Sequence, residues 1–178
     1  YKYSNRHLGE YEYFPAFVIP LQVCRAAASK RFDLETLDIS NNMLAGTMEY
    51  AEADEIKKYN GKNFVEFCRL LKHNRTLTSL NIAGNQLGDA GGAAVAEALH
   101  GNNFKIKSLD VSLNRLGRNA GRAIAAVLSH EANLTSLNIG SNDLYDGVIK
   151  SIFEACARNR QLTSLDVSST RFTEKAPE

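Results

Sequence analysis

Apolar residues recur along this chain in one pattern, L-x-x-L-x-L-x-x-N-x-L. The stretch that begins at Leu77 reads LTSLNIAGNQL, and the stretch that begins at Leu134 reads LTSLNIGSNDL. The pattern fits five times, and its first positions are separated by 43, 29, 28 and 28 residues. The five copies, which we number as units one to five, begin at Leu34, Leu77, Ile106, Leu134 and Leu162. Such regular spacing predicts a repeat protein in which each copy is one structural unit.

Each copy opens with an alternation that predicts a short strand. In unit two, Leu80 and Ile82 fall on one face and Asn81 falls on the other. The chain then turns, and the backbone groups of a buried turn need hydrogen-bond partners, which an asparagine side chain can supply as both donor and acceptor. We therefore expect a buried structural ladder with one asparagine per unit, and Thr170 takes that place in unit five. The expected ladder residues are Asn42, Asn85, Asn114 and Asn142.

The rest of each unit carries apolar residues at helical spacing. We expect helices over Ala90–Leu99, Asn119–Leu128 and Gly147–Cys156, and another around Phe64. Cys24 falls at a core position equivalent to that of Cys156, so inert thiols are expected at both. A single strand and helix cannot bury their apolar faces alone, which predicts that neighbouring units stack.

These strand–helix units of 28 or 29 residues resemble the leucine-rich repeat family, in its ribonuclease-inhibitor-type branch. The resemblance implies an α/β solenoid, a curved right-handed stack with parallel strands on the concave side and helices on the convex side. It covers residues 21–172, which we expect to form the solenoid. Residues 1–20 are aromatic-rich and either cap the stack or dock onto another chain, and residues 173–178 form a tail.

One outward-facing strand residue per unit is a candidate for protein binding. These residues are Asp38, Asn81, Asp110, Asn138 and Asp166. Three carboxylates that alternate with two amides, beside small residues such as Ser112 and Gly140, predict a mildly acidic stripe that a partner can approach closely. The alternative is that this alternation is common repeat filler without a binding role.

Unit one is longer than the others because of an insertion at residues 46–60, GTMEYAEADEIKKYN. The segment is polar, so we expect it to project from the surface as a loop or short helix. Tyr50, Glu52 and Tyr59 are candidate protein contacts in it, and solvated decoration is the alternative.

Arg115, Arg118 and Arg122 cluster at the turn and helix start of unit three, where acidic residues are usually favoured. Three arginines there can hold a carboxylate or phosphate of a partner. The simpler expectation is ion pairing with residues of the neighbouring units. The carboxylates considered for that pairing are Asp89, Asp143 and Asp146.

Composition narrows the class of function. A formal net charge of +1 provides no overall field that would attract nucleic acid, and no apolar run is long enough for membrane insertion. Three cysteines cannot all pair within the chain, which favours a reducing, intracellular compartment, cytoplasmic or cytoskeletal. His73 and His130 lie two units apart, about 10 Å by strand spacing, too far to share a metal. No catalytic order or phosphate loop stands out, so we expect no enzyme activity, cofactor or metal.

These features predict a non-catalytic interaction or scaffold module that binds other proteins, within a larger intracellular assembly. The family resemblance leaves two alternatives open. The first is a regulator such as the GTPase-activating proteins of the Ran system, with Arg115 in the corresponding turn. The second is a structural subunit of a cytoskeletal or axonemal assembly, or the sensing domain of an innate-immunity receptor.

Overall fold

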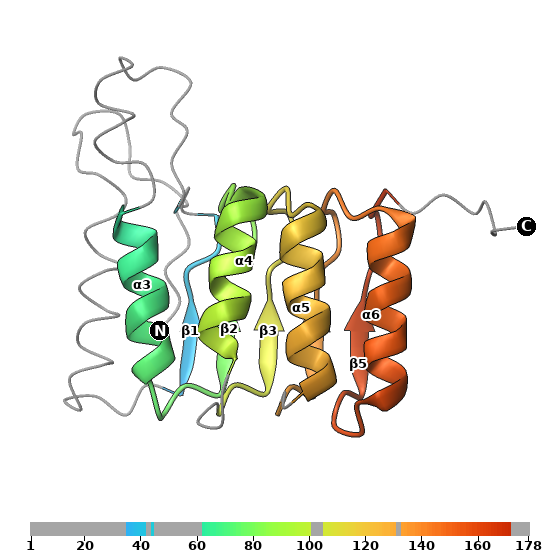
Figure 1. Cartoon of the computed structure of the whole chain (residues 1–178). Coiled ribbons are helices and arrows are strands. Elements are labelled where there is room, and N and C mark those ends of the chain that lie inside the picture. Colours follow the sequence, from blue (N-terminus) through green and yellow to red (C-terminus); the bar gives the residue numbers. More distant parts are fainter. Residues whose placement is uncertain (1–34, 42–43, 45–61, 101–104, 131–132, 172–178) are drawn as a thin grey trace, which may run out of the picture.

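Short strands and helices alternate along the chain (Figure 1). The computed structural model describes residues 35–41, 44, 62–100, 105–130 and 133–171, except for five side chains of the first helix, at positions 62, 63, 65, 66 and 70. The strands are β1 (Thr36–Asp38), β2 (Ser79–Asn81), β3 (Ser108–Asp110), β4 (Ser136–Asn138) and β5 (Ser164–Asp166). The helices are α3 (Lys62–His73), α4 (Gly88–Leu99), α5 (Arg118–His130) and α6 (Asp146–Arg158). All four expected helices are present, and the last three extend beyond the expected bounds by at most two residues at either end.

The five strands form one parallel sheet in the order in which they occur in the sequence. The strands pair in register, so that the middle leucines of neighbouring strands lie side by side. Leu37, Leu80, Leu109 and Leu137 are at most 2% exposed. Leu165 is half-buried, because no strand follows β5 within the described ranges. The structure thereby confirms the predicted α/β solenoid of stacked strand–helix units.

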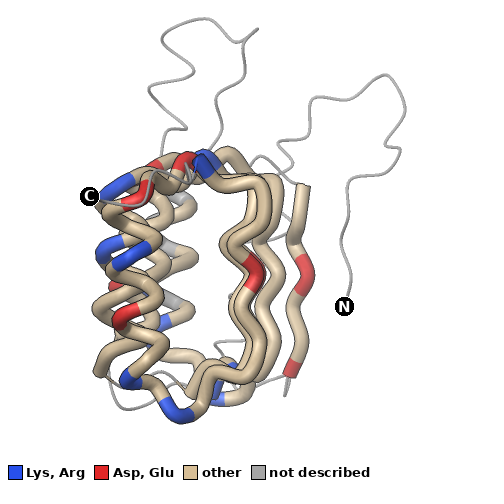
Figure 2. Tube along the Cα trace, turned by 90° about the vertical axis from the view of Figure 1, so that its right-hand side faces the viewer, with Lys and Arg blue, Asp and Glu red and all other residues tan. Residues whose placement is uncertain are grey.

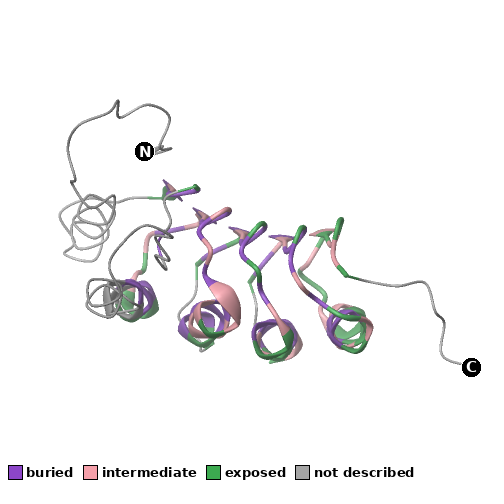
Figure 3. Cartoon of the chain, turned by 90° about the horizontal axis from the view of Figure 1, so that it is seen from above, coloured by how far each residue is buried: buried purple, intermediate pink, exposed green. Residues whose placement is uncertain are grey.

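All four helices lie on one side of the sheet (Figure 3). Each helix packs against the helix of the next unit. Packed helices need about 8–10 Å between their axes, whereas paired strands lie only about 4.8 Å apart. Stacking one helix on each strand therefore curves the two layers, with the strands on the inner side (Figure 3).

Glycines allow the helices to approach closely. A Cβ atom added at Gly92 of α4 would lie 2.4 Å from Leu116 Cδ2, and one added at Gly121 of α5 would lie 2.2 Å from Val148 Cγ1. Both distances are shorter than any normal contact, so the side chains of the next unit occupy the space that a methyl group would need. Small residues at this helical position set the spacing between units.

Candidate functional site

The side of the sheet opposite the helices carries two rows of short polar side chains, which we call the strand face. The first row is the predicted one, Asp38, Asn81, Asp110, Asn138 and Asp166, and these residues are aligned in register. The second row is Thr36, Ser79, Ser108, Ser136 and Ser164, aligned in the same way. Sequence reasoning missed this row, although a serine precedes the middle leucine in four of the five copies.

Residues of the first row each use one side-chain oxygen to end their strand. Asp110 Oδ1 accepts hydrogen bonds from the backbone N of Ser112 at 2.9 Å and from its Oγ at 2.7 Å. In unit four, Asn138 Oδ1 accepts from Gly140 N at 2.9 Å, and Asn138 Nδ2 donates to Asp110 Oδ2 at 3.1 Å. Aspartate and asparagine are equivalent for this turn, so the alternation between them changes the charge of the strand face without changing its backbone.

Hydrogen bonds from Ser168 lower the pKa of Asp166, so this carboxylate is charged at neutral pH. The strand layer carries acidic positions, while many basic positions lie on the helix layer and at the ends of the units (Figure 2). The strand face is therefore mildly acidic and rich in hydrogen-bonding groups.

The small residues expected beside the first row are more covered than the sequence indicates. Ser40 and Ser112 are 7% and 9% exposed, and Ala83 and Gly140 are also buried. The chain turns at these positions, and the two serine hydroxyls donate inward to the aspartate of their own strand. The accessible strand face consequently consists of the two rows alone, with Ser168 exposed at its end.

Beneath the turns, three of the four ladder asparagines lie buried and connect adjacent units. Asn114 Nδ2 donates to Ile82 O in the preceding unit at 2.9 Å and to Val111 O in its own unit at 3.1 Å. Asn114 Oδ1 accepts from the backbone N of Asn85 at 2.8 Å. Asn142 repeats the arrangement by accepting from Asn114 N at 3.0 Å. These bonds satisfy backbone groups inside the stack, which is a structural task. Thr170, in the last unit, donates to Val167 O of its own unit.

Arg115, Arg118 and Arg122 are all exposed at the turn and helix start of unit three. The ion pairs considered for them with Asp89 and Asp143 do not form. Asp143 Oδ1 instead lies 2.7 Å from Arg171 Nε of the next unit. The expected pairing fails because both carboxylates have other partners: Asp143 pairs with Arg171 of unit five, and Asp89 accepts from the backbone of α5.

Asp89 has a different task, which is to cap the helix of the next unit. Its Oδ2 accepts from Asn119 N at 3.1 Å and its Oδ1 from Ala120 N at 2.7 Å, both in the first turn of α5. An aspartate that accepts from such N–H groups also complements the positive end of the helix. Arg118 holds the equivalent place one unit later and cannot accept a hydrogen bond from α6. In α6, the Tyr145 carbonyl accepts from Val148 N at 2.9 Å and Ile149 N at 3.1 Å.

Leu113 is a second departure in unit three that sequence reasoning missed. Its side chain is 57% exposed, and its backbone adopts the left-handed conformation with φ of 57°. Every unit has a positive φ at this turn position, and the other units place small or polar residues there. Those residues are Asn41, Gly84, Ser141 and Ser169. The sequence alone shows that leucine replaces a small or polar residue at this position in unit three. We define Leu113, Arg115, Arg118 and Arg122 as the third-unit rim.

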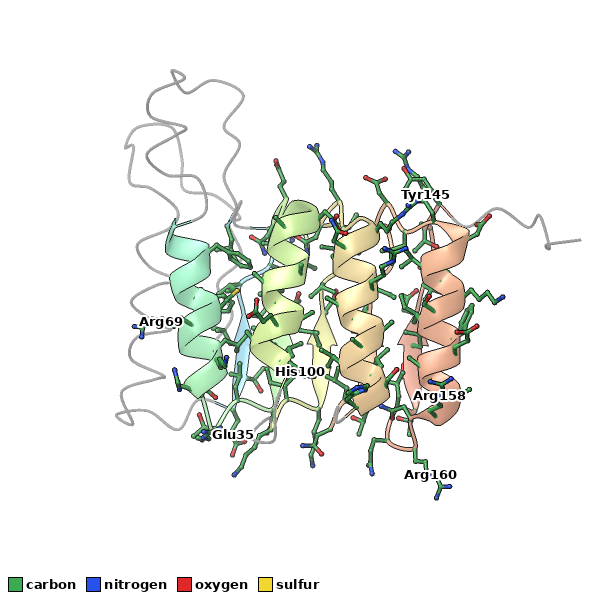
Figure 4. The ribbon with its side chains drawn as sticks, viewed as in Figure 1. Glu35, Arg69, His100, Tyr145, Arg158 and Arg160 are labelled. Atoms are coloured by element: carbon green, nitrogen blue, oxygen red, sulfur yellow. The ribbon has the colours of Figure 1, made fainter. Side chains whose placement is uncertain are left out.

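The corresponding rims of units four and five are paired with each other. Besides its ion pair with Asp143, Arg171 places its guanidinium 5.9 Å from the centre of the Tyr145 ring. Tyr145 is 47% exposed and lies at the end of the units opposite to Arg158 and Arg160 (Figure 4). Arg171 of unit five is therefore held by residues of unit four.

The thiols and histidines show no reactive arrangement in the described ranges. Burial, together with the charge of Glu97, raises the pKa of Cys68 to about 12, and burial raises the pKa of the half-buried Cys156. His100 and His130 lie with ring centres 6.2 Å apart, a pair that the sequence argument did not bring together. No group of three possible metal ligands occurs among the residues searched, and none of the described helices could cross a membrane.

Several sequence-based predictions lie outside the described residues. They include Asn42 of the ladder, Tyr50, Glu52 and Tyr59 of the insertion 46–60, Cys24, and the segments 1–20 and 173–178.

Comparison with known proteins supports the repeat assignment. A family model described as Leucine Rich repeat matches residues 73–96 and 102–125. The chain is 35% identical over 103 residues to NACHT, LRR and PYD domains-containing protein 13 of Homo sapiens, which is 58% of this chain and 10% of that protein. It is 30% identical over 93 residues to ribonuclease inhibitor of Sus scrofa, 52% of this chain and 20% of that protein. The match therefore spans between a tenth and a fifth of these two relatives.

Among solved structures, the chain is similar to Leiomodin-1 Actin-Binding Site 2 (ABS2), with a TM-score of 0.53 and 24% sequence identity. The likeness covers 68% of this chain and 65% of that one. At this level of identity the comparison establishes a common fold.

Proposed function

Because the chain is a leucine-rich repeat protein of the ribonuclease-inhibitor type, we propose that it is a non-catalytic module that binds another protein through its strand face. The observation that carries the proposal is the open side of the sheet. Two aligned rows of polar side chains line it, and the four described helices all lie on the opposite side (Figure 3).

The dimensions and chemistry of this surface suit a protein partner. Five strands about 4.8 Å apart present a face about 20 Å wide, which is the scale of a helix or a loop pair. Short side chains such as Ser108 and Asn138 lose little conformational entropy when a partner orders them. Their hydroxyl and amide groups donate and accept, so they can pair with the backbone or polar side chains of a partner.

A photo-crosslinking experiment tests this proposal. A photoreactive phenylalanine analogue is introduced at Ser136 on the strand face or, as a matched control, at the exposed Glu154 on the helix of the same unit. After irradiation of the full chain in an extract of its native source, we expect a crosslinked polypeptide from position 136 and not from position 154. Crosslinks only from position 154, or from neither position, would contradict binding at the strand face.

The contribution of charge can be separated from that of shape. The variants Asp38→Asn, Asp110→Asn and Asp166→Asn, combined in one chain, keep the oxygen that ends each strand and remove three negative charges. Units two and four already carry asparagine at this place, so the fold should be unaffected. We expect the affinity for the crosslinked partner to fall about tenfold, if each lost charge costs roughly 0.5 kcal/mol. Unchanged affinity would assign recognition to the hydroxyl and amide groups.

We further propose that the module works within a larger assembly. Supporting this, the chain is similar to a short part of NACHT, LRR and PYD domains-containing proteins, and its fold is that of an actin-binding site of leiomodin-1. Co-sedimentation of the purified chain with filamentous actin tests whether the chain binds actin, as the leiomodin-1 similarity suggests. Pelleting above the level of a Ser136→Arg, Ser108→Arg variant would support it, and equal pelleting of both would contradict it.

A further inference from the structure

We infer that the third-unit rim docks an acidic segment of a partner protein, one that also carries a bulky apolar side chain. This inference rests on the proposed protein-binding function and names the chemistry of one contact. The carboxylates would pair with Arg115 and Arg118, and the apolar side chain would cover Leu113.

Leu113 is the first observation behind this inference. More than half of its surface is exposed, at 57%, so it contributes little to the core. Its φ of 57° lies in a region that leucine adopts at a cost, whereas glycine and asparagine adopt it readily. A residue that gains little by burial and holds an unfavourable backbone conformation points to a role outside the folded chain.

The arginines of the rim also stand where they do not stabilise the folded chain. Arg115 has a positive φ, 56°, as Gln86 has at this position in unit two, and its side chain is exposed. Arg118 occupies the place where Asp89 caps the following helix, so the cap is lost and a positive charge stands at the positive end of α5. Arg171, two units further on, is paired with Asp143 of unit four. Within the described ranges, the guanidinium groups of unit three have no such ion pair.

Two carboxylates near this rim are engaged with other groups. Both oxygens of Asp89 accept from the backbone of α5, and Asp143 is held by Arg171. The turn and helix start of unit three therefore combine three exposed arginines with an exposed leucine.

A peptide segment fits this combination better than a free anion does. Arginine binds a carboxylate with two parallel hydrogen bonds, which are strongest where water is excluded. An apolar side chain placed over Leu113 would exclude water from the adjacent ion pairs, in the way that contacts around an interface hot spot do. Inorganic phosphate would use the arginines and leave Leu113 exposed.

Fluorescence anisotropy with defined peptides tests the inference on the full chain. The probe is a labelled twelve-residue peptide of glutamate and aspartate with one central phenylalanine. Its two controls replace the phenylalanine by serine or all acidic residues by lysine. We expect the acidic phenylalanine peptide to bind at least about fivefold more tightly than the serine peptide, since the apolar contact is worth roughly 1 kcal/mol. The lysine peptide should not bind.

The protein variants are chosen so that loss of binding cannot arise from unfolding. Leu113→Asn and Arg115→Asn place asparagine at two positive-φ positions, and Arg118→Asp restores the capping residue found in unit two. We expect each substitution to raise the melting temperature or leave it unchanged. The variant that combines all three should bind the probe about tenfold more weakly, or weaker still. The matched control is Arg160→Asn, an exposed arginine at the opposite end of the units (Figure 4), which should leave the probe affinity unchanged.

Three outcomes would overturn the inference: equal binding of the probe to the combined variant, equal binding of the serine peptide, or full competition by inorganic phosphate. Each leaves the strand-face proposal intact, because crosslinking from position 136 does not involve the rim. Conversely, if position 136 gives no crosslink and the probe still binds, the strand-face proposal is contradicted and the inference about the third-unit rim is retained.

Discussion

The turns of units two and three follow the same backbone path with different exposed residues. Both turns bury a ladder asparagine, Asn85 or Asn114, and both helices carry a glycine where the next unit packs. In unit two the outward positions hold Gly84 and Asp89, which suit a positive φ and a helix cap. In unit three the same positions hold Leu113 and Arg118. The comparison shows that the buried half of the turn builds the stack, while the exposed half is free to serve a partner.

The largest effect is expected from the part that the two units share. Replacing Asn114 by alanine leaves the backbone N–H of Asn85 without its acceptor and removes the donors to Ile82 O and Val111 O. We expect the free energy of unfolding to fall by about 3 kcal/mol, since several buried hydrogen bonds are lost together. Urea denaturation measures it, with the exposed Asn119→Ala as control. A loss below about 1 kcal/mol would contradict a structural ladder.

A smaller loss is expected at the glycine contacts between helices. In Gly121→Ala the new methyl group would meet Val148 Cγ1 at 2.2 Å and Leu144 Cδ2 at 3.0 Å. Overpacking of this kind costs about 2 kcal/mol. Gly147→Ala is the control, because nothing lies within 4 Å of its added Cβ. If thermal unfolding shows both variants equally stable, the close approach of α5 and α6 is not needed.

Removing the cap makes unit two resemble unit three. Asp89→Ala deletes the acceptor of two N–H groups at the start of α5, and we expect a loss of about 1 kcal/mol. Asp143→Ala removes only an exposed ion pair with Arg171, which is worth at most about 0.5 kcal/mol. Chemical denaturation should therefore show a larger loss in the free energy of unfolding for Asp89→Ala than for Asp143→Ala. The reverse order would show that the cap is not formed in solution.

The smallest effect has the opposite sign and makes unit three resemble unit two. Leu113→Asn relieves an unfavourable φ, and Arg118→Asp restores an acidic residue at a helix start, so each should raise stability by about 0.5 kcal/mol. Calorimetry should show a rise in melting temperature of about 2 °C for either variant. A fall in both would mean that Leu113 and Arg118 stabilise the free chain, which would remove the structural reason for assigning them to a partner.

Much of the framework could be predicted from the sequence, because burial imposes the same requirement in every unit. The leucines at the strand centres, the helices and the buried asparagines all follow from one recurring pattern. The candidate site was harder, since its residues lie where the repeats differ. The serine row recurs like a framework position, and the pattern of apolar residues alone does not show that Leu113 is exposed.

Contacts between units depended on the tertiary structure. The repeat places Asp89 and Arg118 at the same position, yet only the stacking of units shows that this position reaches the next helix. The partners Asp143 and Arg171 are 28 residues apart, and their pairing depends on how far one turn is offset from its neighbour. By itself, the sequence determined the repeating unit and its buried face, because periodic burial is a local property of each copy. The tertiary structure decided which charged groups are paired and which remain open to a partner, because those distances arise only when two copies pack together.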